Sequence, residues 1–261
     1  MTEATGYSDH TTHTDEPAPR TKVAIVTGAS RGIGAAIAHR LAHDGFAVVV
    51  NYASRADEAD EVVAALRATG GTAIAVKADI ASADAVTQLF DTAEREVGKV
   101  DVLVNNAGVL TTMALTDTSD ALYEQTFGIN TRGTFNTLRE AGRRMNQGGR
   151  IVNFSSTTLA LNMPGYAIYN ATKAAVEAFT HVFAKELRGR SITVNAVAPG
   201  PVATTLFTDG KTPEQIAQFA KMPPLERLGQ PDDIAGVVSF LAGPDGAWVN
   251  GQILRANGGL A

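Results

Sequence analysis

Residues 22–34, "KVAIVTGASRGIG", decide the fold, because a short β-branched run ends in a glycine-rich turn and continues into an apolar helical pattern. An uninterrupted apolar run of this length is typical of a strand that is buried on both faces. Gly28, Gly32 and Gly34 allow a tight turn, a close approach of backbone N–H groups to a diphosphate, and close packing of helix on strand. The stretch predicts a strand–turn–helix unit that binds a dinucleotide rather than a purely structural turn.

The same alternation of strand and helix continues along the chain, without an internal repeat or a Pro/Gly-rich linker. It indicates an α/β fold of one doubly wound domain, a parallel sheet with helices on both faces joined by right-handed crossovers. In such sheets a ligand binds beyond the carboxyl ends of the strands, here between the first and fourth strands. The predicted strands span residues 22–27, 46–51, 72–77, 100–105, 150–154, 191–197 and 252–256, and the helical patterns span residues 33–43, 55–69, 82–97, 119–145, 168–188 and 232–242.

Composition excludes several classes of protein. The 261 residues are 44% hydrophobic and 19% charged, as in a folded globular protein. A net charge of -5 disfavours a nucleic-acid surface, and the absence of cysteine excludes disulfides, thiolate metal ligands and thiol nucleophiles. No apolar run approaches the ~20 residues that cross a bilayer. We therefore expect no membrane partner and take the cytoplasm as the default location.

The first twenty residues are polar and are predicted to form a disordered tail, so the folded domain is expected at residues 21–261. His10 and His13 lie in this tail. Two histidines without further fixed ligands do not make a metal site, and no metal is expected.

The end of the second predicted strand bears on the choice of cofactor. An enzyme that prefers NAD places a carboxylate there for the ribose, whereas this chain has Asn51, followed by Ser54 and Arg55. Arg31 projects from the glycine-rich turn. Two guanidinium groups that converge here would bind a 2′-phosphate, which favours NADP(H), although both arginines could instead be solvated surface groups.

The stretch "GYAIYNATKAAVEAF", residues 165–179, sets Tyr169 one helical turn before Lys173. Their side chains share one face of a predicted helix. A nearby ammonium group favours the phenolate and lowers the pKa of a tyrosine, so the pair is suited to proton transfer. Ordinary surface packing would give the same spacing.

With "TGASRGIG" at residues 27–34, "NNAG" at 105–108 and "YNATK" at 169–173, residues 21–261 resemble the short-chain dehydrogenase/reductase family. The resemblance implies a Rossmann-type sheet of seven strands, a nicotinamide cofactor, and reversible hydride transfer between an alcohol and a ketone.

The resemblance also assigns catalytic roles. Tyr169 is the expected general acid or base, and Lys173 is expected to lower its pKa and to bind the nicotinamide ribose. Ser156 would bind the substrate oxygen, with Ser155 pointing to the other side of the strand end. Asn130 would hold a water that returns the proton through Lys173. Capping or turn hydrogen bonds are the alternative roles for Ser156 and Asn130.

The cofactor contacts follow from the same resemblance. Asp79 is expected near the adenine, Asn106 to Gly108 beside the adenosine ribose, Val202 at the nicotinamide amide and Thr204 near the diphosphate. The full set comprises Gly28, Ser30, Arg31, Gly32, Ile33, Gly34, Asn51, Ser54, Arg55, Asp79, Asn106, Ala107, Gly108, Tyr169, Lys173, Pro199, Gly200, Val202 and Thr204.

Residues 204–229 form a long insertion with a helical pattern at 213–221, which predicts a lid over the site. Its apolar side chains and others near the strand ends would line a pocket for a largely apolar ketone or keto ester, although half of them could belong to the core. These side chains are Leu110, Met113, Leu159, Leu161, Met163, Tyr166, Leu206, Phe207, Phe219 and Met222.

Other functions and assemblies remain open. The chain is similar to 3-oxoacyl-acyl-carrier-protein reductases, where basic side chains meet an acidic carrier. Arg190 matches one such position, whereas Gln147 departs from the other, which favours a small-molecule carbonyl reductase. A non-catalytic NADPH sensor is a further alternative.

The resemblance also implies a homotetramer that pairs residues 119–145 and 168–188 of neighbouring copies. The apolar face available for it would equally suit packing on the sheet. This face comprises Ala174, Ala175, Ala178, Phe179, Val182 and Phe183.

Overall fold

The sheet has seven parallel strands in the order β3-β2-β1-β4-β5-β6-β7 in the computed structural model, which describes residues 20–261. The strand order reverses between β1 and β4, so these neighbours form the switch point where a ligand is expected. The predicted doubly wound α/β fold is confirmed. The strands are β1 (Val23–Val26), β2 (Ala47–Tyr52), β3 (Ala73–Lys77), β4 (Val100–Asn105), β5 (Arg150–Phe154), β6 (Thr193–Pro199) and β7 (Ile253–Ala256).

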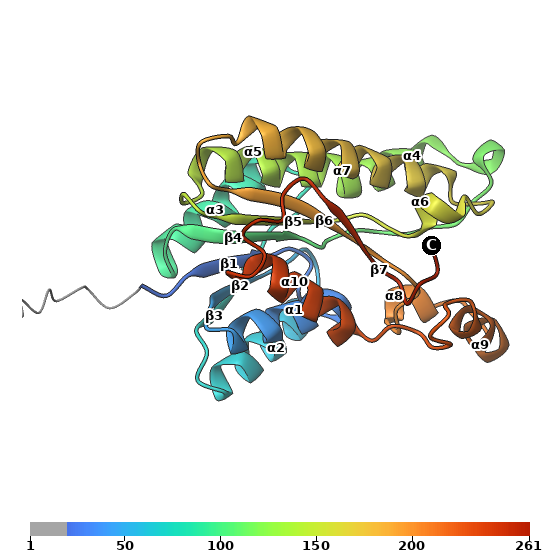
Figure 1. The fold of residues 1–261 in the computed structure, drawn as a ribbon, viewed down its shortest axis with the longest axis horizontal. Helices are drawn as coiled ribbons and strands as arrows, with labels where there is room; N and C mark the ends of the chain where they lie inside the picture. The colour runs from blue at the N-terminus through green and yellow to red at the C-terminus, as the bar shows by residue number, and fades with distance from the viewer. Residues whose placement is uncertain (1–19) are drawn as a thin grey trace, which may run out of the picture.

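Helices cover both faces of the sheet, with α1 (Gly32–His43), α2 (Ala56–Ala68) and α10 (Pro231–Ala242) on one side (Figure 1). The other side carries α3 (Ala83–Glu96), α5 (Thr134–Arg144) and α7 (Ala167–Glu186). Successive residues of β1 alternate between the two cores, because strand side chains point to opposite faces. Both cores are apolar, which explains why the strands read as continuous apolar runs.

The helix predicted over residues 119–145 is interrupted. The chain forms α4 (Asp120–Phe127), a π-helical segment η2 (Gly128–Gly133), and then α5. Gly133 packs so closely on Ile80 that a Cβ would lie 2.6 Å from its Cδ1 atom. The prediction of a single continuous helix was wrong. The π-helical segment, GINTRG, contains no proline that would have signalled an interruption of the helix. The segment places Asn130 beside the switch point.

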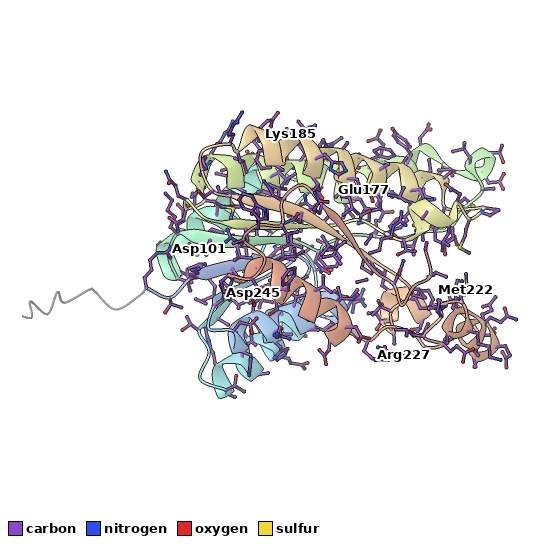
Figure 2. All side chains as sticks on the ribbon, viewed as in Figure 1. Asp101, Glu177, Lys185, Met222, Arg227 and Asp245 are labelled. Atoms are coloured by element: carbon purple, nitrogen blue, oxygen red, sulfur yellow. The ribbon has the colours of Figure 1, made fainter. Side chains whose placement is uncertain are left out.

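Arg20, the first residue that the structure describes, is attached to the sheet. Its guanidinium group pairs with Asp101, whose Oδ2 also accepts a hydrogen bond of 2.8 Å from Val23 N. Burial alone would raise the pKa of Asp101, but the hydrogen bonds from Arg20, Val23 and Asn146 hold it below its usual value. Figure 2 shows Asp101 at the end of the molecule away from Met222.

The predicted tail, apart from Arg20, lies outside the described residues, as do His10 and His13. Within residues 20–261, no helix has both the length and the apolar content needed to span a membrane.

The long insertion folds into two short helices at one end of the sheet, α8 (Thr205–Thr208) and α9 (Pro213–Lys221) (Figure 1). The helix predicted at residues 213–221 is therefore confirmed. Thr212 and Gln215 form a reciprocal capping box at its start, and Pro213 occupies the first turn, where its missing N–H costs nothing. Two further short elements were not predicted, η1 (Leu115–Asp117) and α6 (Thr158–Leu161).

Candidate functional site

The glycine-rich turn after β1 and the loop after β4 are locked together at the switch point. Asn106 Nδ2 donates to Thr27 O at 2.9 Å and to Gly28 O at 3.0 Å, and Ala107 N donates to Thr27 Oγ1 at 3.0 Å. A Cβ on Gly34 would collide with Gly28 O and lie 2.5 Å from Asn106 Nδ2. The turn therefore keeps a bare backbone at the N-terminus of α1, which is the arrangement that binds a diphosphate.

Asn51 lies beneath this turn instead of facing a ligand. Its side chain is 1% exposed, and its Nδ2 donates to Val76 O at 3.2 Å and to Ala78 O at 3.0 Å. Its Oδ1 accepts from Gly28 N at 3.4 Å. The side chain ties the ends of β2 and β3 to the turn, and a cofactor contact at Asn51 stays a prediction.

Arg31 and Arg55 line one shallow hollow beside the turn, and Glu58 and Glu61 line it too. Arg31 is exposed, and Arg55 forms a 2.7 Å ion pair with Glu58. Their convergence agrees with the prediction of a site for a 2′-phosphate. Ser54 is exposed but does not line this hollow.

The segment after β6 reaches the same edge. Thr204 is the N-cap of α8. A Cβ added to Gly32 would lie 3.5 Å from Thr204 Cγ2, so Thr204 lies against the glycine-rich turn. Val202 is buried and pairs with Gly229 at the far end of the insertion. Asp79 is exposed after β3, where its Oδ1 accepts a hydrogen bond from Ala81 N.

Tyr169, Lys173 and Ser156 meet in one cavity of about 160 Å³. The loop after β4 and the segment after β6 line the same cavity, which joins the expected catalytic residues to the expected cofactor positions. These cofactor positions are Ile33, Asn106, Gly108, Pro199, Gly200, Val202 and Thr204.

Lys173 is almost completely buried at the end of β5. Its side chain is 5% exposed, and its Nζ donates a 2.8 Å hydrogen bond to Phe154 O. The same Nζ lies 5.6 Å from the centre of the Tyr169 ring. Burial disfavours the ammonium form and lowers the pKa of Lys173 to about 8.

The pKa of Tyr169 differs from the expectation. Burial raises it to about 12, while the Ser156 hydroxyl acts in the opposite direction and the neighbouring Tyr166 adds to the increase. Lys173 directs one N–H at Phe154 O. The Tyr169 phenol is in its protonated form at neutral pH, as a proton donor must be.

The two adjacent serines point in different directions, as expected. Ser155 Oγ donates to Glu177 Oε1 of α7 at 2.5 Å, whereas Ser156 Oγ lies 2.9 Å from Thr158 Oγ1 and accepts from Thr158 N at 3.3 Å. Figure 2 labels Glu177 on α7. Ser156 therefore makes the turn hydrogen bond that was its alternative role, and it also lines the cavity beside Tyr169.

The Asn130 side chain joins the loop after β4 to α7. Its Oδ1 accepts from Val109 N at 2.9 Å, and its Nδ2 donates to Val109 O at 2.9 Å and to Thr172 Oγ1 at 3.1 Å. Both side-chain N–H donors are therefore used within the protein, while the backbone carbonyl accepts one hydrogen bond, from Thr134 Oγ1 at 2.8 Å, and has a second lone pair. The water expected at Asn130 stays a prediction.

Most of the predicted apolar pocket is present. Met113 and Leu159 do not line the cavity, and Met113 is 41% exposed. Phe207 and Phe219 contact each other edge to face, with ring centres 5.2 Å apart. Leu260 also lines the cavity, and it was not predicted from the sequence. Its place shortly after the last strand is a signal that could have found it, because the carboxyl ends of parallel strands lie at one edge of the sheet. The predicted side chains that do line it are Leu110, Leu161, Met163, Tyr166, Leu206, Phe207, Phe219 and Met222.

Within residues 20–261, no group of three or more His, Cys, Asp or Glu side chains could hold a metal ion. The titratable side chains that line the cavity are Tyr166, Tyr169 and Lys173. The arrangement is suited to proton transfer at a neutral, largely apolar ligand.

Known proteins share this architecture. Residues 28–261 match the family model described as enoyl-(acyl carrier protein) reductase. A short-chain type dehydrogenase/reductase of Picea abies is 46% identical over 91% of this chain and 92% of its own length. A protein of Arabidopsis thaliana named as an NADPH-dependent aldehyde reductase-like protein, chloroplastic, is 43% identical over 97% of this chain and 99% of its own.

A solved structure gives the same result. A short-chain dehydrogenase from Burkholderia cenocepacia, in complex with NADP, superposes with a TM-score of 0.87 at 38% identity, covering 92% of this chain and 98% of that one. The fold agrees with these matches, and the chain belongs to the short-chain dehydrogenase/reductase family.

Proposed function

We propose that this protein is an NADP(H)-dependent reductase that converts the ketone of a small, largely apolar ketone or keto ester to the alcohol, reversibly. The observation that carries the proposal is the single cavity shared by Tyr169, Lys173 and Ser156 with apolar walls on one side and the expected cofactor positions on the other. This combination brings a proton donor to the place where a carbonyl group would meet the cofactor.

The residues present fit NADP(H). The bare backbone around Gly28 and Gly34 accommodates a diphosphate, and the Arg31–Arg55 hollow offers two cations to a 2′-phosphate. The Arabidopsis relative named for NADPH and the NADP complex of the Burkholderia enzyme support the same choice. When bound, the nicotinamide supplies the hydride for reduction or accepts it in the reverse direction.

The chain's own residues handle the proton. Tyr169, a phenol that is protonated at neutral pH, donates to the carbonyl oxygen, and Ser156 hydrogen-bonds the same oxygen. Phe154 O occupies one of the three N–H donors of Lys173, which leaves the others for a ribose hydroxyl and for the phenolate. Below its pKa of about 8, Lys173 carries the positive charge that stabilises this phenolate.

The substrate is proposed to be a free small molecule rather than an acyl group on a carrier protein. Arg190, the candidate for binding an acidic carrier, directs its guanidinium group at Gly142 O and, at 2.7 Å, at Met145 O. It therefore neutralises the carbonyl end of α5 instead of presenting its charge to a partner. Gln147 is exposed and uncharged. A 3-oxoacyl-acyl-carrier-protein reductase remains the alternative.

We also propose the homotetramer expected from the family resemblance. Ala174, Ala178 and Val182 are exposed along α7, which leaves an apolar stripe for a second copy. Phe179 and Phe183 are partly buried and pack on the core, so they belong to the sheet face. The cytoplasmic location stays a prediction.

Oxidation of NADPH should be measured with aryl ketones, keto esters and an acetoacetyl thioester as substrates. We expect fast turnover of the free ketones. The Tyr169→Phe variant should keep NADPH affinity but lose about 10²- to 10⁴-fold in turnover, because it lacks the acid. Turnover of the thioester alone would favour the carrier reductase, and NADPH binding without any turnover would favour a sensor. Equal turnover by the variant and the original enzyme would remove Tyr169 from the mechanism.

Replacing the two arginines tests the choice of cofactor. The Arg31→Ala/Arg55→Ala variant should raise KM for NADPH by about tenfold or more, since each charge-assisted hydrogen bond to a phosphate is lost. KM for NADH should change little. Arg95→Ala, on α3 across the sheet, is the matched control and should alter neither value. An equal rise for both cofactors would show that the arginines do not recognise the 2′-phosphate.

Light scattering after gel filtration tests the assembly. We expect a particle of four chains of 27.2 kDa each. Ala178→Arg on the exposed stripe of α7 should reduce the particle mass, because a charged side chain would be buried in the interface. Ala64→Arg, exposed on α2, should leave it unchanged. A monomeric original protein would contradict the proposal.

A further inference from the structure

We propose that the segment Asn257–Leu260, which follows β7, is a fixed wall of the substrate cavity, and that Leu260 sets the bulk of ketone that the enzyme accepts. The inference rests on the proposed reductase function and specifies its substrate selection. It arises from one observation that the motifs did not indicate: Leu260 lines the same cavity as Tyr169 and Ser156.

The backbone of this segment turns back toward the site directly after the last strand. Gly258 and Gly259 have φ values of 65° and 88°, a region that residues with a Cβ rarely adopt. Leu260 N then donates to Asn257 O at 3.3 Å and closes the turn. The end of the chain lies between α6 and the α8–α9 insertion (Figure 1). Two glycines in succession thus place the Leu260 side chain at the cavity.

Asn257 anchors the segment to the strand ends that form the site. It is 8% exposed, and its Nδ2 donates to Thr157 Oγ1 at 3.2 Å and to Ala261 O at 3.0 Å, while its Oδ1 accepts from Gly259 N at 3.0 Å. Thr157 follows Ser156 directly. Gly200 approaches from β6 so closely that a Cβ there would lie 2.9 Å from Asn257 Cα. Leu260 is therefore held in register with the catalytic serine.

The returning end of the insertion rests on the same segment. A Cβ on Gly258 would lie 3.1 Å from Pro223 Cβ, and one on Gly259 would lie 3.2 Å from Pro224 Cγ. Pro223 and Pro224 come directly after Met222, which lines the cavity from the lid side. The segment is thus a support on which the base of the lid sits, while α8 and α9 belong to a long connection that is able to move.

A fixed apolar wall selects substrates by size. The side chains of a long connection can adjust to a larger ketone, whereas the backbone that carries Leu260 is held by the hydrogen bonds of Asn257 and by the bond from Leu260 N to Asn257 O. A bulky ketone substituent would overlap Leu260. Each methylene group that a pocket accepts or rejects changes specificity by about 10-fold or more.

The test compares Leu260→Ala with the original enzyme on acetophenone and 2-acetonaphthone. We expect the ratio of kcat/KM for the naphthyl ketone to that for acetophenone to rise about 10-fold or more. Leu115→Ala is the control, because Leu115 is 63% exposed and does not line this cavity. It should leave the ratio unchanged. NADPH affinity, measured by fluorescence titration, should be equal in all three proteins.

Asn257→Asp tests the anchor, since it keeps the shape but removes the Nδ2 donor to Thr157. It should move the ratio in the same direction as Leu260→Ala. If Leu260→Ala still reduces both ketones with an unchanged ratio of kcat/KM values, the proposal that Leu260 limits substrate bulk is wrong, while the reductase function stands. Absence of ketone turnover in the original enzyme would instead overturn the proposed function. The same rise in Leu115→Ala would also overturn the assignment to Leu260.

Discussion

Four buried polar side chains join two helices to two strands, and the site depends on their hydrogen bonds. Each is at most 4% exposed, so an unpaired member would lose its bonds to water without replacement. All of them are satisfied together, which fixes where α5 and α7 lie on the sheet. The row runs from Thr137 of α5 to Asn105 of β4, Asn153 of β5 and Thr180 of α7, with donor–acceptor distances of 2.7, 2.9 and 2.9 Å.

This row also determines where the reacting groups lie. Lys173 precedes Thr180 by about two helical turns and shares its face of α7. Once Thr180 is bonded to Asn153, Lys173 reaches the next carbonyl of the same strand, Phe154 O. Tyr169, one further turn along, then meets Ser156. Burial disfavours the charged form of both groups, because it raises the pKa of Tyr169 and lowers the pKa of Lys173. The hydrogen-bonded row therefore holds in place two side chains whose charged forms are destabilised by burial.

Much of the fold was predictable, because buried parallel strands and amphipathic helices leave periodic patterns, and the carboxyl ends of parallel strands meet at one edge. The meeting of Tyr169, Lys173 and Ser156 in one cavity was implied by the helical spacing of the first two and by the family resemblance. The sequence could not predict the hydrogen bonds that side chains make with residues distant along the chain. Asn51 turns inward to β3, Arg190 turns to α5, and Asn130 uses its amide on Val109. Leu260 was missed because its position depends on the packing of Gly258 and Gly259 against Pro223 and Pro224 of the insertion.

Transfer of deuterium from NADPH labelled at the nicotinamide C4 is the most direct measurement of the central claim, that the Tyr169 cavity reduces a ketone with hydride from the cofactor. Acetophenone would be reduced with each C4 epimer in ordinary water, and the alcohol analysed by NMR. We predict one deuterium at the carbinol carbon with one epimer and none with the other, while the hydroxyl proton comes from solvent through Tyr169. Alcohol without deuterium from either epimer, or no alcohol despite bound NADPH, would contradict the account.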